Sequence, residues 1–207
     1  KIKKNFILTL FADKKNLKLK INNAGKNYIM NTLCCIATIK ELNLTLYKAK
    51  NFFKTQSFLE GRGKINKIKK FDKKFFLVDE SYNANPLSVK SAIENFSNIQ
   101  KKGKRKYFLF GDMLELGRNS NIYHKKISKF INNSDIDKTF VYGDKAIQTY
   151  KLLRKNKRGE VVKNLKSFNG TISQVLNNGD FLMIKGSNAT KLHKISKEFL
   201  RGATYAL

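Results

Sequence analysis

Proline and tryptophan are almost missing from this chain of 207 residues, which holds one proline, Pro86, and no tryptophan. Long apolar runs are missing as well, since none approaches the roughly 20 residues that a membrane-spanning helix needs. Near the start of the sequence, Asp13, Lys14 and Lys15 interrupt the apolar segment. We therefore expect neither membrane insertion nor a signal peptide.

Cysteine and histidine are scarce, with two residues of each type. Cys34 and Cys35 are adjacent and cannot build a disulfide framework, so we expect two small buried residues of a reduced, cytosolic protein. His124 and His193 lie far apart in the sequence, and no Cys/His cluster has the spacing of a metal site. We expect both histidines at the surface or in helix packing, and no metal site in this chain.

Familiar nucleotide-binding and catalytic motifs are also missing. The sequence has no G-x-x-x-x-G-K-[ST] phosphate loop, no G-x-G-x-x-G fingerprint and no G-x-S-x-G nucleophile elbow. It has no initiator methionine either, and we expect a fragment of a longer protein. The residues alone therefore leave the catalytic groups unidentified.

Positive charge is abundant, with a formal net charge of +28. Such a balance favours a nucleic-acid-binding protein as one hypothesis. The lysines, however, are spread along nearly the whole chain, and the abundance of Lys, Asn, Ile and Phe indicates a codon bias toward A and T. A solvated, lysine-rich surface is the better interpretation, and its general field would favour anionic substrates.

The first part of the chain predicts two strands followed by two helices. The strands are expected at residues 5–11 and 16–21, with a turn at 12–15 between them, and the second strand alternates between apolar and polar residues. The helices are expected at 27–42 and 46–58. Their predicted core-facing residues are Met30, Leu33, Cys34, Ala37 and Leu42 in the first helix, and Ala49, Phe52 and Phe53 in the second.

A flexible joint is predicted at Gly61-Arg62-Gly63, where two glycines flank an arginine. We place the domain boundary there, between residues 62 and 63; the alternative is an ordinary loop with a surface arginine.

After the joint, strands and helices alternate. Strands are predicted at 65–70 (as an edge strand), 74–79, 106–110, 138–142, 160–163 and 180–184, and helices at 86–99, 120–132, 144–154, 168–177 and 189–200. Repeated βα units with short connections predict an α/β fold with a doubly wound, mainly parallel, Rossmann-like sheet.

The stretch from Phe75 to Pro86 is the most informative part of the sequence. An apolar strand ends in Asp79 and Glu80, a polar turn follows, and Pro86 suits the first turn of a helix. The conservative interpretation is a capped turn with solvated acids. Polar residues follow other predicted strands too: Gly111-Asp112, Gly143-Asp144 and Lys185-Gly186-Ser187. In a parallel sheet these strand ends meet at one edge, the expected binding face.

The same segments resemble the Mur ligase family. Asp79-Glu80-Ser81-Tyr82-Asn83-Ala84-Asn85-Pro86 is similar to the D-[DE]-S-Y-N-A-N-P motif of the Mur ligases that add D-alanyl-D-alanine. Gly111 to Gly117, followed by His124, resembles the family's G-D-M-L-E-L-G segment and its downstream histidine. Lys185-Gly186-Ser187 resembles its K-G-S element. Gly25 to Asn31 and Gly61-Arg62 match the order of its G-x-H-N-x-x-N and G-R elements.

The resemblance implies a domain organisation and a reaction. Residues 1–62 would be the C-terminal part of a central ATP-binding domain, its last two strands and two helices, and residues 63–207 the C-terminal domain. The enzyme would be cytoplasmic and act in peptidoglycan synthesis. It would use ATP and Mg²⁺ to join D-alanyl-D-alanine to UDP-N-acetylmuramoyl-tripeptide through an acyl phosphate. The phosphate loop and the main magnesium ligands would lie outside this chain, which we expect to be inactive alone and monomeric.

The resemblance also implies roles for particular residues. On the nucleotide side it names Asn31, Arg62, Asp79, Glu80 and Tyr82. On the dipeptide side it names Asn83, Asn85, Asp112, Glu115, Lys185 and Ser187; turn capping is the alternative for Asn83 and Asn85, and a solvated loop acid for Glu115.

The chain departs from the family pattern at two positions. Asn27 stands where the family usually has histidine, and Tyr28 replaces the asparagine that follows it. These departures bear on nucleotide affinity and leave the fold unaffected. A related ligase that adds a different amino acid is a further alternative, and the Tyr-Asn-Ala-Asn-Pro run argues against it.

Overall fold

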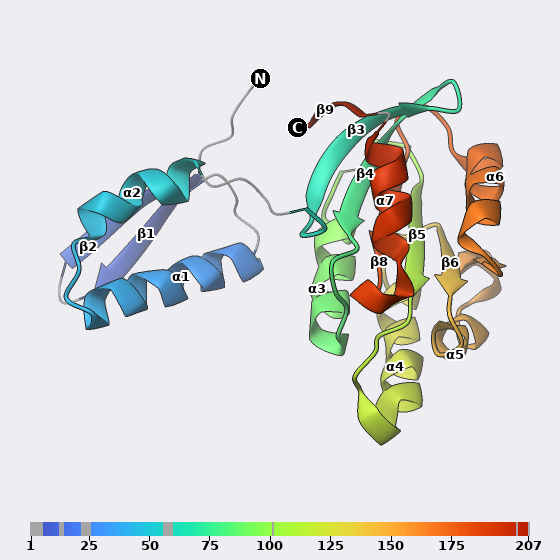
Figure 1. Cartoon of the computed structure of the whole chain (residues 1–207), viewed down its shortest axis with the longest axis horizontal. Helices are drawn as coiled ribbons and strands as arrows, with labels where there is room; N and C mark the ends of the chain where they lie inside the picture. Colours follow the sequence, from blue (N-terminus) through green and yellow to red (C-terminus); the bar gives the residue numbers. More distant parts are fainter. Residues whose placement is uncertain are drawn as a thin grey trace. The chain divides into compact units, whose positions relative to one another are not determined.

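The computed structural model describes residues 6–12, 15–21, 26–55, 60–100, 102–201 and 203–206 (Figure 1). The chain divides into two compact units, Lys1–Ser57 and Phe58–Leu207. The division falls a few residues before the predicted joint, so Gly61 and Arg62 belong to the second unit. The assignment of the two units to named ligase domains stays a prediction.

The first unit contains the two strands and two helices that the sequence predicts. Strands β1 (Phe6–Ala12) and β2 (Lys15–Ile21) pair antiparallel, and helices α1 (Lys26–Glu41) and α2 (Leu46–Thr55) follow. Residues 13–14 of the predicted turn and 56–58 of the predicted second helix lie outside the described residues.

The core of the first unit confirms the alternation of β2 and corrects the predicted faces of the helices. Leu19, Ile21, Ile36 and Phe53 are buried together. Most residues assigned to the core face of α1 are instead exposed: Met30, Cys34, Ala37 and Leu42. Helix α1 is apolar on two sides, so two different rows of its residues have helical spacing. The row that contains Ile36 packs in the core of the unit, and the predicted row does not.

Two further residue predictions in the first unit are wrong. Cys34 and Cys35 are both exposed free thiols and not buried residues, because they lie on the unpacked side of α1. Phe52 is 55% exposed, while the neighbouring Phe53 is buried. On a helix of ten residues only one of two adjacent aromatic rings can face the strands.

The second unit is built on a seven-stranded sheet in the order β7-β6-β5-β8-β4-β3-β9 (Figure 1). The strands are β3 (Lys64–Lys70), β4 (Lys73–Glu80), β5 (Lys106–Gly111), β6 (Lys138–Tyr142), β7 (Arg158–Val161), β8 (Phe181–Lys185) and β9 (Ala203–Ala206). Strands β4 to β8 pair in parallel, while β3 pairs antiparallel with both β4 and β9. The predicted α/β, mainly parallel fold is therefore confirmed. The prediction that residues 65–70 form an edge strand is wrong, because β9, which the sequence did not indicate, pairs outside β3.

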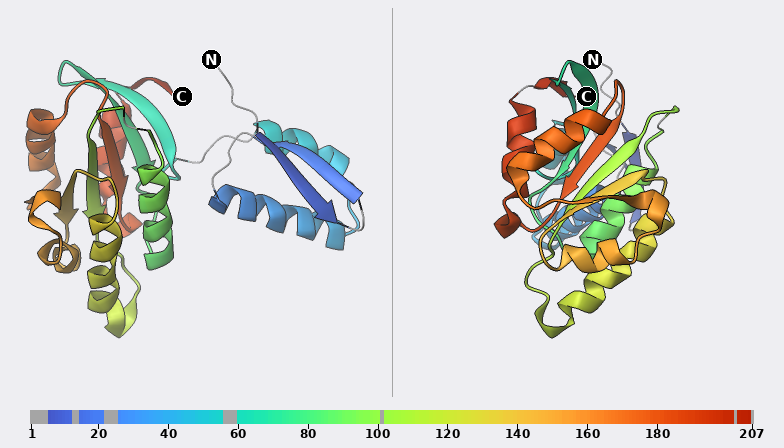
Figure 2. Two further views of the ribbon diagram at one scale, coloured as in Figure 1. Left: turned by 180° about the vertical axis from the view of Figure 1, so that it is seen from behind. Right: turned by 90° about the vertical axis from the view of Figure 1, so that its right-hand side faces the viewer.

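Helices cover both faces of this sheet, as Figure 2 shows from the side. The helices are α3 (Pro86–Ser97), α4 (Ser120–Asn132), α5 (Ala146–Lys151), α6 (Leu165–Val175) and α7 (Leu192–Leu200). One apolar cluster joins α3, α4 and α5 to the sheet, and a second joins α6 and α7 to its other face. Helix α3 buries Val89, Ile93 and Phe96 against the sheet.

Several predicted boundaries shift by a few residues. Helix α5 is shorter than the predicted 144–154, and α6 begins earlier than predicted. The segment before α7 is not α-helical, because a 3₁₀ turn, η3 (Asn188–Thr190), precedes a left-handed Lys191. Similar 3₁₀ turns, η1 (Gly117–Asn119) and η2 (Lys155–Lys157), precede α4 and β7.

The connections place a topological switch point at the ends of β4, β8 and β5. The helices that follow β4 and β5 pack on one face of the sheet, and α7, which follows the intervening β8, packs on the other. Loops that leave a sheet in opposite directions open a crevice at the carboxyl ends of the strands. The polar residues that the sequence placed after these strands therefore meet at one edge.

Candidate functional site

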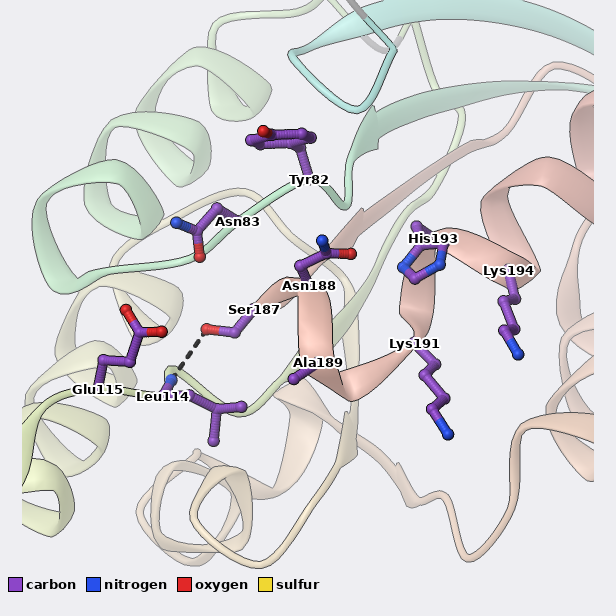
Figure 3. A pocket seen from close by; sticks show the side chains of 10 residues that line it. All are labelled: Tyr82, Asn83, Leu114, Glu115, Ser187, Asn188, Ala189, Lys191, His193 and Lys194. Atoms are coloured by element: carbon purple, nitrogen blue, oxygen red, sulfur yellow. Dashed lines mark hydrogen bonds between the residues drawn. The ribbon is translucent and has the colours of Figure 1, made fainter.

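A groove of about 500 Å³ lies at this edge of the second unit (Figure 3). Three segments line it, one after each of the strands β4, β5 and β8. The lining residues are Tyr82, Asn83, Leu114, Glu115, Ser187, Asn188, Ala189, Lys191, His193 and Lys194. The groove therefore joins the segments of all three predicted motifs.

Asp79 fixes the backbone behind the groove. It is 4% exposed, and its carboxylate accepts four hydrogen bonds. Oδ2 accepts one from the backbone N–H of Gly61 at 3.1 Å, and Oδ1 accepts from the N–H and Oγ of Ser81 and from Oγ of Ser196, at 3.2, 2.6 and 2.7 Å. A buried carboxylate needs such compensation. Its oxygens are thus engaged within the protein, and Asp79 ties the joint, the turn after β4 and helix α7 together.

Glu80 and Lys185 form a largely buried pair at the ends of adjacent strands. Lys185 Nζ lies 3.4 Å from Glu80 Oε2 and donates to the backbone oxygen of Asn83 at 3.0 Å. Burial raises the pKa of Glu80, and the Lys185 ammonium opposes that rise. Burial likewise lowers the pKa of Lys185, against the favourable charge of Glu80. The Lys185 side chain is 3% exposed and that of Glu80 is 22% exposed. Glu80 is therefore the member of the pair that a ligand can reach.

Arg62 and Tyr82 stack at the rim of the site. The guanidinium carbon of Arg62 lies 4.2 Å from the centre of the Tyr82 ring, and Tyr82 remains 50% exposed. Gly61 lies close behind Tyr82 and has a φ of +72°. Any other residue at this position would place its Cβ 2.8 Å from the backbone nitrogen of Tyr82. Only glycine allows this close approach without strain.

The two asparagines of the turn act locally. Asn85 is the N-cap of α3: its Oδ1 accepts from the N–H of Ser88 at 2.8 Å, and Ser88 Oγ accepts from the N–H of Asn85 at 3.0 Å. The capping alternative is therefore confirmed for Asn85, which does not line the groove. Asn83 Oδ1 accepts from the N–H of Ala84, and the residue is exposed and lines the groove.

The loop after β5 is held by its own carboxylate. Asp112 Oδ1 accepts from the N–H groups of Lys145 and Ala146 at 3.0 and 2.7 Å, at the start of α5. Burial raises the pKa of Asp112, and these two amides oppose that rise. A Cβ at Gly143 would collide with this carboxylate, so glycine leaves it the room it needs.

His124 and Ser187 hold the next part of this loop. His124 Nε2 accepts from the N–H of Met113 at 3.0 Å, and Ser187 Oγ accepts from the N–H of Leu114 at 2.9 Å (Figure 3). The other ring nitrogen, Nδ1, lies 2.8 Å from the backbone oxygen of Ser120, so it carries the proton of the neutral ring. Burial lowers the pKa of His124. The histidine is thus a buried helix-packing residue that shapes the loop.

Glu115 belongs to this loop and lies in the groove. Its backbone is left-handed, with a φ of +63°, and its side chain is exposed and lines the groove. Ser187, in contrast, is 5% exposed, and its hydroxyl also donates to the backbone oxygen of Ala84 at 3.2 Å. Ser187 therefore links all three strand ends.

Sequence reasoning located the right strand ends but missed part of the site. Asn31 belongs to the first unit, on α1, and the geometry of the second unit does not include it. Four groove residues between Asn188 and Lys194 had no predicted role: Asn188, Lys191, His193 and Lys194. Their signal is weak, since only their position after Lys185-Gly186-Ser187 marks them. Among the described residues, no group of three or more His, Cys, Asp or Glu side chains is placed to hold a metal ion.

A family model described as "Mur ligase, glutamate ligase domain" matches residues 66–188. The chain belongs to the Mur ligase family. This stretch covers all strands of the sheet except β9 and the start of β3, and it includes the segments after β4 and β5 and the beginning of the one after β8. The fold and family predicted from the sequence are both confirmed.

Individual relatives agree with this membership. The UDP-N-acetylmuramoyl-tripeptide–D-alanyl-D-alanine ligase of Bacillus subtilis is 28% identical over 179 residues, 85% of this chain and 38% of that protein. The ligase of the same name from Buchnera aphidicola (Acyrthosiphon pisum) is 32% identical over 132 residues, 60% of this chain and 27% of that protein. The chain thus spans well under half the length of these curated relatives.

Solved structures share the fold. The MurF ligase of Thermotoga maritima, determined in complex with ADP, superposes with a TM-score of 0.76 at 18% identity, over 96% of this chain and 44% of that one. MurF of Acinetobacter baumannii gives a TM-score of 0.77 at 18% identity, over 95% of this chain and 42% of that one. No helix among the described residues has the length and apolar character to cross a membrane.

Proposed function

We propose that this chain is part of a UDP-N-acetylmuramoyl-tripeptide–D-alanyl-D-alanine ligase that acts in cytoplasmic peptidoglycan synthesis. The observation that carries the proposal is the groove itself: its walls are the three segments that resemble this branch of the family, and the relatives with this name match along most of the chain. The substrates are ATP, UDP-N-acetylmuramoyl-tripeptide and D-alanyl-D-alanine.

The proposed chemistry activates a carboxylate that an amine alone attacks poorly. A carboxylate oxygen of the tripeptide attacks the γ-phosphorus of ATP, ADP leaves, and an acyl phosphate forms. The amine of D-alanyl-D-alanine then attacks the acyl carbon, inorganic phosphate leaves, and the nitrogen loses a proton as the amide forms. Enclosing the acyl phosphate protects it from water. The described residues do not form a magnesium site, and we assign Mg²⁺ to parts of the protein outside them.

On the nucleotide side, the contacts support Glu80, Arg62 and Tyr82 as direct ligands, because all three leave polar or aromatic surface accessible. Glu80 is proposed to accept from ribose hydroxyls, and the open face of the Tyr82 ring offers an apolar platform. Asp79 is proposed to act by position, because its four hydrogen bonds engage its carboxylate. Asn31 stays a proposed nucleotide contact of the first unit.

On the dipeptide side, Asn83 and Glu115 are proposed as direct contacts, since both are exposed in the groove. Asn85, Asp112, Lys185 and Ser187 are proposed to shape it. Asn85 caps α3, Asp112 anchors the loop after β5, Lys185 anchors the turn after β4, and Ser187 bonds both segments.

The test is phosphate release by the full-length product of the gene that encodes this chain. The protein receives ATP, magnesium and both peptide substrates, and each substrate is omitted in turn. Release that requires both UDP-N-acetylmuramoyl-tripeptide and D-alanyl-D-alanine is expected. Release that proceeds equally well with another amino acid in place of the dipeptide would favour a different ligase of the family. Isotopically heavy oxygen in the tripeptide carboxylate should appear in the phosphate if an acyl phosphate forms.

The basic nucleic-acid-binding protein is the weaker hypothesis. It rests on the net charge alone, while the comparisons and the groove favour the ligase. Tight, steeply salt-dependent binding of RNA or DNA would be its signature.

A further inference from the structure

The charges of the groove are arranged unequally along its length. Glu115 stands at one side, on the loop after β5, and Lys191, His193 and Lys194 stand at the other, at the start of α7 (Figure 3). Between them lie Ser187, whose hydroxyl is engaged by the backbone, and Ala189. The groove thus presents an acid at one end and two ammonium groups at the other.

The basic end has a defined backbone. Lys191 is left-handed, with φ +61° and ψ +15°, and its N–H donates to the backbone oxygen of Asn188 at 3.0 Å. The residue before it, Thr190, donates from Oγ1 to the backbone oxygen of Ser187 at 2.6 Å. The residue after it, Leu192, is fully buried against Gly111 and Gly186. A left-handed lysine is uncommon. These contacts hold it in that conformation, with its side chain exposed at the groove.

The two ammonium groups of this end are available to a ligand. Neither Lys191 nor Lys194 forms an ion pair with a carboxylate among the residues that the structure describes. The Nδ1 atom of His193 is buried and has no hydrogen-bond partner in this part of the chain. Because this atom is buried, the two exposed ammonium groups are the atoms that a ligand in the groove meets.

We propose that Lys191 and Lys194, with His193 beside them, bind the carboxylate of the incoming dipeptide, whose amino end lies toward Glu115. This inference rests on the proposed function, because it assigns the direction of D-alanyl-D-alanine in the groove. The dipeptide is a zwitterion with one ammonium and one carboxylate, and the groove carries both kinds of complementary charge. Charge-assisted hydrogen bonds from ammonium to carboxylate are among the strongest in proteins.

The inference also separates Lys185 from the other lysines of the site. Lys185 is 2% exposed and already donates to Asn83 and Glu80, so it does not reach the dipeptide carboxylate. Lys191 and Lys194 are both exposed. Specificity for a free carboxyl terminus therefore lies in α7, beyond the segments that resemble the family motifs.

The test compares D-alanyl-D-alanine with its C-terminal amide, using the full-length gene product. We expect the unmodified protein to have a KM for the amide about tenfold higher than for the dipeptide. The double variant Lys191→Gln/Lys194→Gln should raise the KM for the dipeptide by about tenfold. It should leave the KM for the amide, the KM for ATP and kcat nearly unchanged. Lys191→Arg/Lys194→Arg keeps both charges and should restore most of the discrimination.

A matched control removes the same two charges elsewhere. Lys69→Gln/Lys74→Gln changes a pair of exposed lysines on β3 and β4, at the end of β4 opposite to the groove, and the KM for the dipeptide should stay the same. The inference is wrong if the α7 variant keeps its preference for the dipeptide over the amide, or if both double variants raise the KM equally. If the unmodified protein shows no dipeptide-dependent phosphate release, the proposed function fails and the inference fails with it.

Discussion

Two grooves that the described residues of the second unit form are nearly equal in size and rich in lysine, and one of the two has the structure of a site. The groove at the carboxyl ends of β4, β5 and β8 measures about 500 Å³, and one at the opposite end of β4 measures about 510 Å³. The second groove is lined by Lys67, Lys69, Asp72, Lys74, Phe76, Asn178 and Gly179. Volume and positive charge therefore do not tell them apart.

The difference lies in how many segments the buried polar side chains behind each groove hold together. Behind the carboxyl-end groove, Asp79, Asp112, His124 and Ser187 are hydrogen-bonded to backbone groups of the segments around it. The opposite groove is formed mainly by exposed lysines of the β3–β4 hairpin, where Lys69 faces Lys74 directly across the strands. Beside it, one buried carboxylate, Asp180, accepts from the N–H groups of Arg105 and Asn177. A buried polar framework costs free energy unless every member is paired, so its presence identifies a place where backbone geometry matters.

The largest contrast is expected between two aspartates given the same substitution. Asp79→Asn should lower the free energy of unfolding by about 3 kcal/mol, because an amide group cannot accept all four hydrogen bonds and places donors against donors. Asp72→Asn, in the opposite groove, should cost less than about 0.5 kcal/mol, because this side chain is exposed. Urea unfolding followed by circular dichroism measures both, and equal losses would show that Asp79 is no more structural than a surface acid.

Two left-handed glycines give the next contrast. Gly61→Ala should cost about 2 kcal/mol, because the new Cβ meets the backbone of Tyr82 at 2.8 Å. Gly179→Ala, with a φ of +86°, meets only the flexible side chain of Lys104 and should cost about 1 kcal/mol for the backbone conformation. Thermal melting of the two variants checks the order. A Gly179 variant that melts below the Gly61 variant would contradict the close approach at the joint.

A smaller effect is expected from His124, through pH. Burial lowers the pKa of this histidine below its usual 6.5, so the folded state resists its protonation. Its contribution to stability is therefore complete above about pH 6.5 and is lost as the pH falls below that value, at no more than about 1.4 kcal/mol per pH unit. The stability difference between the unmodified chain and His124→Gln should shrink between pH 7.5 and 5.5. A difference that stays constant over this range would mean that His124 does not titrate there.

The smallest effect is expected from Lys69→Gln/Lys74→Gln. Removing like charges that face each other across an antiparallel pair should raise the free energy of unfolding by about 0.5 kcal/mol. The gain should disappear in high salt, which screens exposed charges. A clear loss of stability in urea unfolding would contradict this prediction. It would show that the two lysines make favourable contacts that outweigh their mutual repulsion.

The sequence predicted the sheet well because its signals are local. Apolar runs that end in Asp79-Glu80, Gly111-Asp112 and Lys185-Gly186-Ser187 mark buried parallel strands, and all three ends meet as expected. Strand β9 was missed because it carries no such run and forms only by pairing with β3. The packed side of α1 was missed because both sides are apolar and the choice depends on the tertiary partner.

The site was predictable in position and only partly in detail. Tyr82, Asn83 and Glu115 are exposed in the groove, and Glu80 is partly exposed near it, as direct contacts must be. Asp79 and Lys185, in contrast, are engaged by groups distant in the sequence, such as Ser196 for Asp79, which no local pattern reveals. The basic end at Lys191 was not predictable, because it depends on a left-handed residue between a 3₁₀ turn and α7.

The most direct measurement of the central claim is the mass of the product made by the full-length gene product. UDP-N-acetylmuramoyl-tripeptide is incubated with ATP, magnesium and D-alanyl-D-alanine, and the nucleotide-linked species are analysed by mass spectrometry. The account predicts a species heavier than the tripeptide substrate by one dipeptide less one water, formed only with ATP and with one ADP per product. A well-folded protein that yields no such species under these conditions would contradict the assignment of the groove to dipeptide ligation.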